Sequence, residues 1–341
     1  MSLTKVYNRM ISPEATRVIQ GRARIDYGSA TSVNVFVPEN IVMAGFRWMG
    51  SYKNGNGLYL STGIGSNGSV SVNNTTDLAV ETSVHTNNWY AVFAVANDAD
   101  STSTFVNMPF FRAASVASNV ISLAQGGETD GDTITATTYT MATNALVGSE
   151  VLIIQENKQF SGKTTTVTAN TNGSVTVANA GSMGATDFFL VAPSGYDHYC
   201  YLGSWYMDAS EPRNMADALQ EVSSYGIDIP SVPATGAIGT ATRYPLAGLV
   251  SPLSTGYIFS LTFSLSTAST GNCAHYVWHD SSNHETYSNY VNKYSSSTET
   301  YVEASNKIMF SREQAIWLST GGSLDANVAN RAIRTLGWIE M

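Results

Sequence analysis

The chain contains little charge. Asp, Glu, Lys and Arg together make up 13% of its 341 residues, about half the share of an average soluble domain. The 17 Lys and Arg are outnumbered by 26 Asp and Glu, so the formal net charge is −9 and there is no basic stripe for a phosphate backbone. In place of charge the chain carries 41 Ser, 36 Thr and 28 Gly. We therefore expect no nucleic-acid partner, and the composition favours a structural or binding protein.

Cysteines and long apolar runs are also scarce. Two cysteines, Cys200 and Cys273, are too few for a disulfide framework. We expect buried free thiols, with a single bridge as the alternative. The first twelve residues contain no apolar stretch of the length that a secretory signal needs, and the longest apolar run, residues 89–96, is far shorter than the roughly 20 residues that span a bilayer. We expect a protein that is made in a cytoplasm and has no membrane insertion.

Helix signals are few and strand signals are frequent. Short runs rich in Val, Thr, Phe and Tyr alternate with turn residues, which is the pattern of sandwiches and barrels. Residues 164–177 predict a hairpin around Asn172-Gly173, and residues 89–96, apolar on both faces, predict a central strand covered from each side. Only residues 211–226 and 311–318 carry helix signals. We predict an all-β protein of tandem β-sandwich or jelly-roll-like domains, with a smaller inserted β domain and little helix.

Shifts in composition suggest where the domains begin and end. Residues 1–12 form a polar arm, and residues 113–187 are rich in small residues and Thr but contain no Trp. Aromatic residues return after this segment, so we interpret residues 13–112 and 188–228 as one β domain interrupted by the insert. A Pro-containing linker then leads to a C-terminal β domain, residues 234–341.

Three of the five histidines lie within ten residues, close to a cysteine. On a strand Cys273, His275 and His279 share a face, and His284 follows after a short turn. Sulfur and nitrogen are zinc ligands, but residues 275 and 279 are roughly 13 Å apart along an extended strand. We therefore expect no metal, and interpret the four residues as a hydrogen-bonded polar cluster at an interface or a solvated loop, with zinc as the alternative.

No pattern of catalytic residues stands out. Asp197, His198 and Cys200 are nearest to a nucleophilic cluster, but they lie among aromatic residues typical of a core. The acidic loop 126–132 lacks the full calcium-loop pattern. We expect a protein that is not an enzyme and has no cofactor. A polysaccharide depolymerase, which needs two carboxylates placed about a glycosidic bond, is the enzymatic alternative.

Aromatic residues gather in one stretch of the C-terminal domain. Trp278, Tyr287, Tyr290, Tyr294 and Tyr301 are interspersed with Ser and Asn. Tyr with Ser and Asn is the composition of adaptable recognition surfaces, and it is also found in a solvated β-meander. These five residues are our candidate binding surface.

Four short motifs resemble those of a known group of proteins. They are NWYAVFAV at 88–95, PSGY at 193–196, YLGSWY at 201–206 and TLGWIE at 335–340. The first three are similar to a β domain of tailed-bacteriophage fibre proteins, and the last is similar to the closing strand of such domains. The chain thus resembles tailed-phage virion appendage proteins: tail fibres, tail spikes and adaptors.

The first residues carry a similar likeness. Leu3, Val6, Met10 and Ile11 are apolar anchors in a polar segment, and this segment looks like the short N-terminal segment of tail-spike and tail-fibre proteins. The resemblance implies a docking arm that binds a neighbouring virion protein. It also implies threefold assembly, because appendages of this kind are threefold.

These observations together predict a structural component of a tailed-phage virion. We expect a symmetric homo-oligomer, with a trimer favoured, that is made in the host cytoplasm and docks on neighbouring virion proteins. The alternatives are an adhesin that binds a host receptor or surface glycan, and a capsid decoration protein.

Overall fold

The computed structural model describes the larger part of the chain. The described residues are 24–36, 41–43, 59–61, 67–71, 85–97, 103–118, 131–136, 139–155, 163–180, 183–185, 187–209, 211–212, 227–229, 231–246, 249–266, 270–278, 285–293, 300–310 and 314–340. Within them every regular element is a β-strand except the 3₁₀ turn η2 (Asp325–Asn327), which confirms the all-β prediction. No helix in these ranges is long and apolar enough to cross a membrane.

The chain divides into two compact units. Unit 1 is Met1–Ile154 with Gly162–Asn214, and unit 2 is Gln155–Ser161 with Met215–Met341. The described strands of unit 1 are β1 (Arg24–Ser29), β2 (Ser32–Phe36), β3 (Ile41–Met43), β4 (Tyr59–Ser61), β5 (Asn67–Ser71), β6 (Asn88–Ala96), β7 (Ser103–Pro109), β8 (Phe111–Ser118), β9 (Asp132–Ala136), β10 (Glu150–Ile154), β11 (Lys163–Asn170), β12 (Ser174–Val177), β13 (Phe188–Val191) and β14 (His198–Met207). They form two three-stranded sheets, β1-β2-β5 and β14-β6-β7, the pair β3-β4, and a closed barrel.

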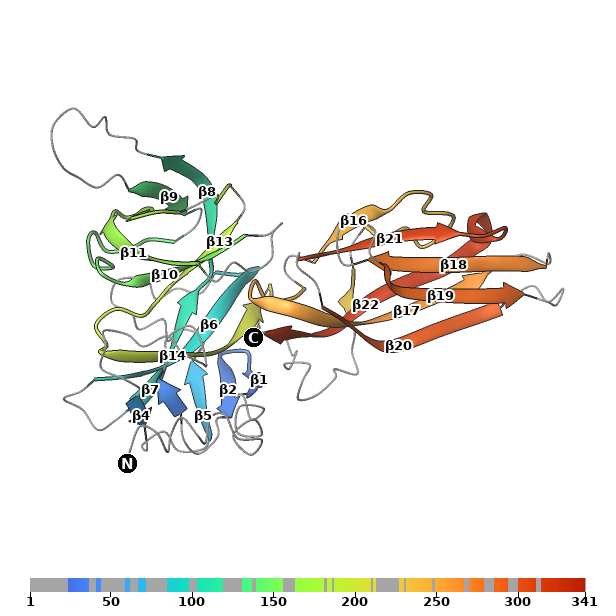
Figure 1. Cartoon of the computed structure of the whole chain (residues 1–341). Coiled ribbons are helices and arrows are strands. Elements are labelled where there is room, and N and C mark those ends of the chain that lie inside the picture. The colour runs from blue at the N-terminus through green and yellow to red at the C-terminus, as the bar shows by residue number, and fades with distance from the viewer. Residues whose placement is uncertain are drawn as a thin grey trace, which may run out of the picture. The chain divides into compact units, whose positions relative to one another are not determined.

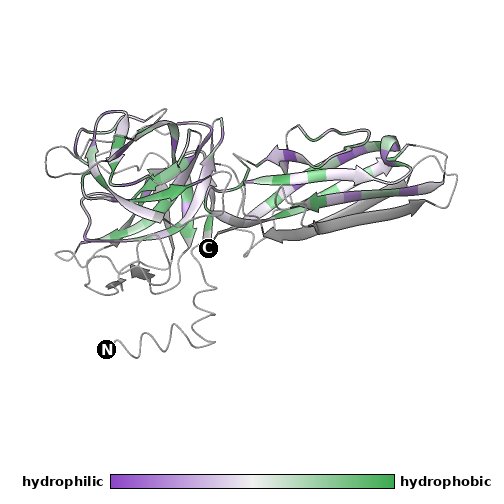
Figure 2. Ribbon diagram, turned by 45° about the horizontal axis from the view of Figure 1, so that its top comes forward, coloured by the Kyte–Doolittle hydropathy of each residue, from purple (hydrophilic) through white to green (hydrophobic). Residues whose placement is uncertain are grey.

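The barrel runs in the order β10-β11-β12-β9-β8-β13 (Figure 1). Alternation along its strands separates the core from the surface: Ile134, Val167 and Val175 are buried, whereas Thr135 and Thr168 are exposed. The same alternation appears in Figure 2 as green segments on strands that also carry pale and purple ones. Closure gives every strand two neighbours, so the barrel has no free sheet edge.

Two predicted elements of unit 1 are confirmed. β11 and β12 pair antiparallel, with Val167 opposite Val177, so residues 164–177 form the expected hairpin. β6 is the middle strand of β14-β6-β7, and residues 89–96 are all buried. A strand that is apolar at every position needs cover on both of its faces, and the burial of each residue shows that β6 has it.

Unit 2 contains two four-stranded sheets. Its strands are β15 (Ile227–Asp228), β16 (Thr242–Pro245), β17 (Ser254–Leu265), β18 (Gly271–Trp278), β19 (Glu285–Lys293), β20 (Thr300–Phe310), β21 (Ala315–Gly321) and β22 (Val328–Glu340). One sheet has the order β15-β22-β17-β20 and the other β16-β21-β18-β19. This is the strand order of a jelly roll, in which successive strands are shared between two facing sheets. Tyr257 of β17 donates a hydrogen bond from its hydroxyl to the carbonyl of Ala315 in β21, at 2.9 Å, and so joins the two sheets.

The helix expected at residues 311–318 is wrong. Residues 315–321 form β21, which lies between β16 and β18 with Ala315 opposite Pro245 and Trp317 opposite Trp278. The four residues AIWL at 315–318 are all apolar, and a short apolar run does not distinguish a buried strand from a buried helix. The backbone of these residues pairs with β16 on one side and with β18 on the other, and this pairing makes the segment a strand. The other helix prediction, at 211–226, falls mainly on residues outside the described part.

The insert predicted at 113–187 overlaps the barrel. Four of the barrel strands, β9 to β12, lie within this range, while β8 begins at Phe111 and β13 begins at Phe188. The expected separation of the insert from its host domain stays a prediction, as do the limits 13–112, 188–228 and 234–341.

Candidate functional site

The most unusual group of polar side chains lies inside unit 2, between the two sheets. His275 of β18 is fully buried, and Arg331 of β22 is 4% exposed. The guanidinium Nε of Arg331 donates a hydrogen bond of 2.9 Å to Nε2 of His275. The imidazole also packs against the ring of Phe263 from β17, with 4.1 Å between ring centroids. The pair therefore crosses the core and connects one sheet to the other.

The other nitrogens of Arg331 bind backbone carbonyls. Nη1 donates to the carbonyl of Pro233 at 2.6 Å, and Nη2 donates to that of Gly236 at 2.5 Å. A buried guanidinium keeps its charge and needs acceptors in place of the water that it loses. Here the acceptors are an imidazole and two carbonyls, so this cation is held by dipoles of the chain.

The protonation of His275 follows from this geometry. Because Nε2 accepts from Arg331, the neutral imidazole carries its proton on Nδ1, and within the described residues Nδ1 has no hydrogen-bond partner. Burial, and secondarily the charge of Arg331, lower the pKa of His275 to about 3. Burial also lowers the pKa of Arg331. His275 is therefore neutral at pH 7 and acts as an acceptor, which differs from the role of an acid or base that exchanges protons near neutrality.

The structure describes two of the four residues of the predicted polar cluster. Cys273 and His275 share β18 and are both buried, while His279 and His284 lie outside the described residues. Within the described part no group of three or more His, Cys, Asp or Glu side chains is placed to hold a metal ion. The hydrogen-bonded partner of His275 is Arg331, which comes from a strand more than fifty residues away in the sequence.

The candidate binding surface is distributed over three strands. Trp278 ends β18, Tyr287 and Tyr290 are in β19, and Tyr301 is in β20. β19 pairs with β18, with Tyr287 opposite Val277. β20 belongs to the other sheet, where Tyr301 lies opposite Ser264 of β17. The side chains of these four residues and all of Tyr294 lie outside the described part, so a shared surface stays a prediction.

The candidate docking arm also stays a prediction. Leu3, Val6, Met10 and Ile11 lie outside the described residues, which begin at Arg24. The same holds for most of the acidic loop 126–132. Asp132 at its end is described, and its carboxylate accepts a hydrogen bond of 2.6 Å from the backbone N–H of Ala180.

Both cysteines are free and buried, in agreement with the expected free thiols. Cys200 is fully buried in β14, and its thiol donates to the carbonyl of Tyr201 at 3.5 Å. Burial raises the pKa of Cys273 to about 11. A thiol needs solvent access and ionisation to act as a nucleophile, and neither cysteine has both. The sequence Asp197-His198 beside Cys200 is thus not an accessible nucleophilic cluster.

This burial predicts the reactivity of the thiols. We expect both cysteines to resist a disulfide reagent such as Ellman's reagent at pH 8 in the native protein, and both to react within minutes in guanidinium chloride. The released chromophore, counted per chain, measures this directly. Fast reaction of one thiol in the native protein would contradict the burial described here.

Unit 1 has a second buried polar network, built on tyrosines. The hydroxyls of Tyr90 and Tyr139 are 2.5 Å apart, and the amide of Asn88 donates to the Tyr139 hydroxyl at 2.8 Å. Tyr90 also stacks on Trp205, with centroids 4.7 Å apart, and the Trp205 indole donates to the side-chain oxygen of Asn107 at 3.1 Å. These bonds join the loop after β9 to the sheet β14-β6-β7, and so tie the barrel to its neighbouring sheet within unit 1.

Removal of one hydroxyl tests this network. We expect Tyr139→Phe to lower the unfolding free energy of unit 1 by about 1–2 kcal/mol, because Asn88 and Tyr90 each lose a buried partner. Tyr27→Phe is the matched control, since the Tyr27 hydroxyl bonds Glu211 at an exposed position, and we expect no measurable change there. Hydrogen exchange of the β6 amides measures both effects, and equal effects of the two substitutions would contradict the prediction.

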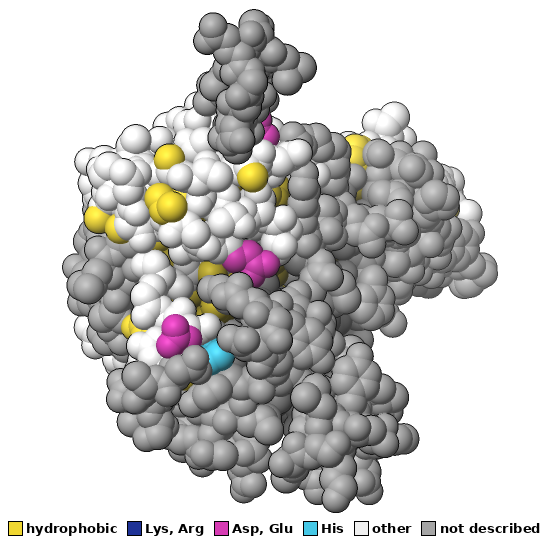
Figure 3. All heavy atoms as spheres, turned by 60° about the vertical axis from the view of Figure 1, so that its left-hand side comes forward, with side chains coloured by type: hydrophobic (Ala, Val, Ile, Leu, Met, Phe, Trp, Pro, Cys, Tyr) yellow, Lys and Arg dark blue, Asp and Glu magenta, His cyan; other side chains and the backbone are white. Residues whose placement is uncertain are grey.

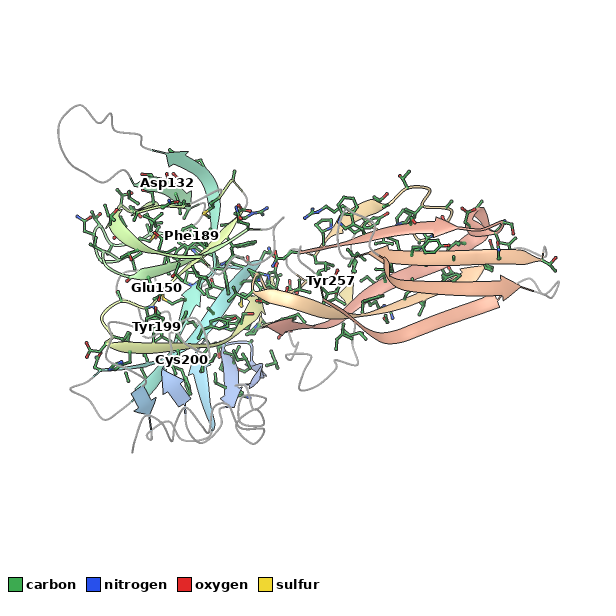
Figure 4. All side chains as sticks on the ribbon, viewed as in Figure 1. Asp132, Glu150, Phe189, Tyr199, Cys200 and Tyr257 are labelled. Atoms are coloured by element: carbon green, nitrogen blue, oxygen red, sulfur yellow. The ribbon has the colours of Figure 1, made fainter. Side chains whose placement is uncertain are left out.

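A third connection lies between the barrel and β14. Figure 4 shows Tyr199 next to Glu150 of β10, and the tyrosine hydroxyl donates to the glutamate carboxylate. Burial, followed by the charge of Glu150, raises the pKa of Tyr199 above its ordinary value. The hydroxyl therefore remains a donor throughout the neutral range, and the contact is a structural bond.

Arg331 was missed by sequence reasoning, although a signal was present. In β22 the buried residues Ile333 and Thr335 lie two and four positions after Arg331, so a strand puts all three on one face. An arginine in register with core residues indicates a buried cation that needs acceptors. What supplies those acceptors was not visible, because Pro233, Gly236 and His275 are far away in the sequence.

Searches against protein-family models, curated proteins and solved structures gave no match to this chain. The function proposed below therefore depends on the residues of the chain itself and on the resemblance of its short motifs.

Proposed function

We propose that the protein is a structural component of a tailed-phage virion, in a tail fibre, spike or adaptor, that works as a symmetric homo-oligomer. The observation that carries the proposal is that the buried polar side chains hydrogen-bond to other parts of the chain. Arg331, His275, Tyr90, Tyr139 and Tyr199 bind other parts of the chain and fasten sheets together. Such internal bonds suit a mechanical element better than a reactive site.

The described surface is consistent with this role. On the face of unit 1 drawn in Figure 3 the described side chains are mostly uncharged, with isolated acidic groups and a histidine. Exposed Thr and Ser residues of the barrel, such as Thr135, Thr166 and Ser115, contribute to the uncharged surface. Jelly-roll domains are moreover a common building block of virus particles.

The proposed mechanism is assembly. Residues 1–12 dock on a neighbouring virion protein through Leu3, Val6, Met10 and Ile11, while the two β units build the projecting part. Copies related by a threefold axis then each present one face to a different face of the next copy, and the ring closes. A trimer is the assembly that the resemblance favours.

Deletion of residues 1–12 tests the docking role. We expect the truncated chain to keep the circular dichroism spectrum and the solution mass of the full chain, and to be missing from purified particles when it replaces the full chain in an infection. The matched control replaces the four apolar anchors by Ala and keeps the length. Normal incorporation of both variants would contradict the proposal, as would a monomeric mass of the full chain by light scattering.

A further inference from the structure

The turn of the β11–β12 hairpin consists of an asparagine followed by a glycine. Asn172 is exposed, and within the described residues neither its side chain nor the backbone N–H of Gly173 makes a hydrogen bond. The residues on either side are held: the Thr171 N–H donates to the Ser174 carbonyl at 2.9 Å, and their hydroxyl oxygens are 2.8 Å apart. The turn therefore presents a side-chain amide next to a backbone nitrogen, and no described residue engages either group.

These two groups can react with each other. The Gly173 nitrogen loses its proton to water and attacks Cγ of Asn172, so that an N–Cγ bond forms, the Cγ–Nδ2 bond breaks and Nδ2 leaves as ammonia. Because both groups belong to one turn, the attack is intramolecular. Water then opens the five-membered ring, either at Cγ to give aspartate or at the backbone carbonyl carbon to give isoaspartate. One water is consumed and one ammonia is released, and no other reactant is needed.

The surroundings of the glycine leave the attacking nitrogen unhindered. A Cβ built on Gly173 would meet no atom within 4 Å, and glycine itself moves more freely than any other residue. Asn170 of the same hairpin is the opposite case. It is 2% exposed, its Nδ2 donates to the Ala142 carbonyl at 2.7 Å, and its Oδ1 accepts from the Leu146 N–H at 3.0 Å. Both ends of that amide are held, so its Cγ cannot turn toward the next nitrogen.

A second Asn-Gly step within the described ranges is placed differently. Asn67 and Gly68 lie inside β5, where they pair with Phe36 and Val35 of β2. Ring closure there would require the backbone to leave an antiparallel ladder. The step at 172–173 lies between two strands, so the same reaction does not break a strand pair.

The turn also holds the segment that follows β9. The Asn172 carbonyl accepts from the Met141 N–H at 2.8 Å, and the Gly173 carbonyl accepts from the Ala136 N–H at 2.9 Å. Tyr139, which bonds to the sheet β14-β6-β7, lies between these two donors in the sequence. Isoaspartate adds a carbon to the main chain between the two acceptors and turns the first of them into a carboxylate outside the main chain. The two bonds cannot both keep their geometry after that change.

We propose that Asn172 is a self-modification site, which converts in the native protein to aspartate and isoaspartate and so releases residues 136–141 from the hairpin. The reaction needs only water, and it adds one negative charge to a chain whose formal net charge is −9. This inference does not depend on the function proposed above. It means that the barrel end around Tyr139 loosens with the age of the molecule.

The test follows three asparagines of one region in the full-length protein. Samples kept at pH 6 and at pH 9 are digested, and fragment-ion mass spectrometry reads Asn170, Asn172 and Asn179 separately. We expect Asn172 to convert at least about tenfold faster than the other two, which is a barrier about 1.4 kcal/mol lower. Conversion is faster at pH 9, because the deprotonated nitrogen is the nucleophile. Gly173→Ala is the matched control: the site has room for the methyl group and no left-handed φ, and the added Cβ crowds the nitrogen, so conversion slows by about tenfold.

The consequence is measured on the converted molecules, which anion exchange separates by their added charge. Hydrogen exchange of the Ala136 and Met141 amides should be faster in this fraction than in the unconverted protein and in Asn172→Asp, which keeps the normal main chain. An Asn172 that stays intact in the native protein, but converts when the chain is unfolded in urea, would overturn the site. Equal conversion in Gly173→Ala would overturn the attack by the nitrogen. Unchanged exchange of both amides in the converted fraction would overturn the release of residues 136–141.

Discussion

Replacement of Arg331 by methionine is expected to lower the unfolding free energy of unit 2 by about 3–5 kcal/mol, because it removes the donor to three buried or half-buried acceptors at once. Those acceptors are Nε2 of His275 and the carbonyls of Pro233 and Gly236. Methionine nearly matches the length of the apolar stem of arginine, so little packing is lost. Hydrogen exchange of the amides of β22 and of residues 227–246 measures the effect within unit 2 alone.

Arg334→Met is the matched control for this substitution. Arg334 lies three positions further along β22, and its side chain is 51% exposed in an ion pair with Asp228. An exposed ion pair contributes about 0–1 kcal/mol, so we expect a small change. Equal effects of the two substitutions would show that the hydrogen bonds of Arg331 do not stabilise unit 2 more than an exposed ion pair does. The double variant His275→Phe with Arg331→Met should recover part of the loss, because an apolar pair leaves fewer unsatisfied groups.

The second large effect is on the stability of unit 2 in acid. The pKa of His275 is 6.5 as an unperturbed side chain and about 3 in the fold, where burial and Arg331 oppose protonation. Between these values the unfolded chain binds one proton more than the folded chain. The unfolding free energy therefore falls as the pH falls from 6.5 to 3, by about 1.4 kcal/mol per pH unit. The contribution of His275 is complete above pH 6.5 and is lost by pH 3.

His275→Gln separates this effect from the titration of carboxylates. A glutamine side-chain oxygen can accept from Arg331 and does not titrate, so we expect the variant to lose the slope that His275 adds. The measurement is urea unfolding at a series of pH values, with the difference between the native chain and the variant plotted against pH. His198→Gln is the control, because His198 is only partly buried, and we expect it to retain the slope. Parallel curves for the native chain and His275→Gln would contradict the assignment.

Local patterns in the sequence were sufficient for several elements. The alternation in residues 164–177 with Asn172-Gly173 at the turn predicted the β11–β12 hairpin. The continuous apolar run at 89–96 predicted the buried central strand β6. Both predictions depend on side-chain period and turn chemistry, which are properties of neighbouring residues. The low helix content follows from the same signals.

Other features required contacts between distant residues. Residues 315–318 are apolar at every position, so their period did not distinguish helix from strand, and the pairing of β21 with β16 and β18 decided the matter. The histidine group shows the same limit. Sequence proximity grouped His275 with Cys273, His279 and His284, and only the fold shows that Arg331 of β22 donates a hydrogen bond to it.

The sequence by itself determined the all-β class of this protein and a composition low in charge and rich in hydroxyl groups, and it predicted the two free thiols that the structure confirms. Only the tertiary structure decided which strands close into a barrel, which form the two sheets of unit 2, and which buried polar groups meet. The physical reason is the distance in sequence between the residues that interact. A strand or turn is specified by the residues within it. The acceptors of a buried guanidinium such as Arg331 come from residues distant in the sequence, here His275 on β18 and the carbonyls of Pro233 and Gly236.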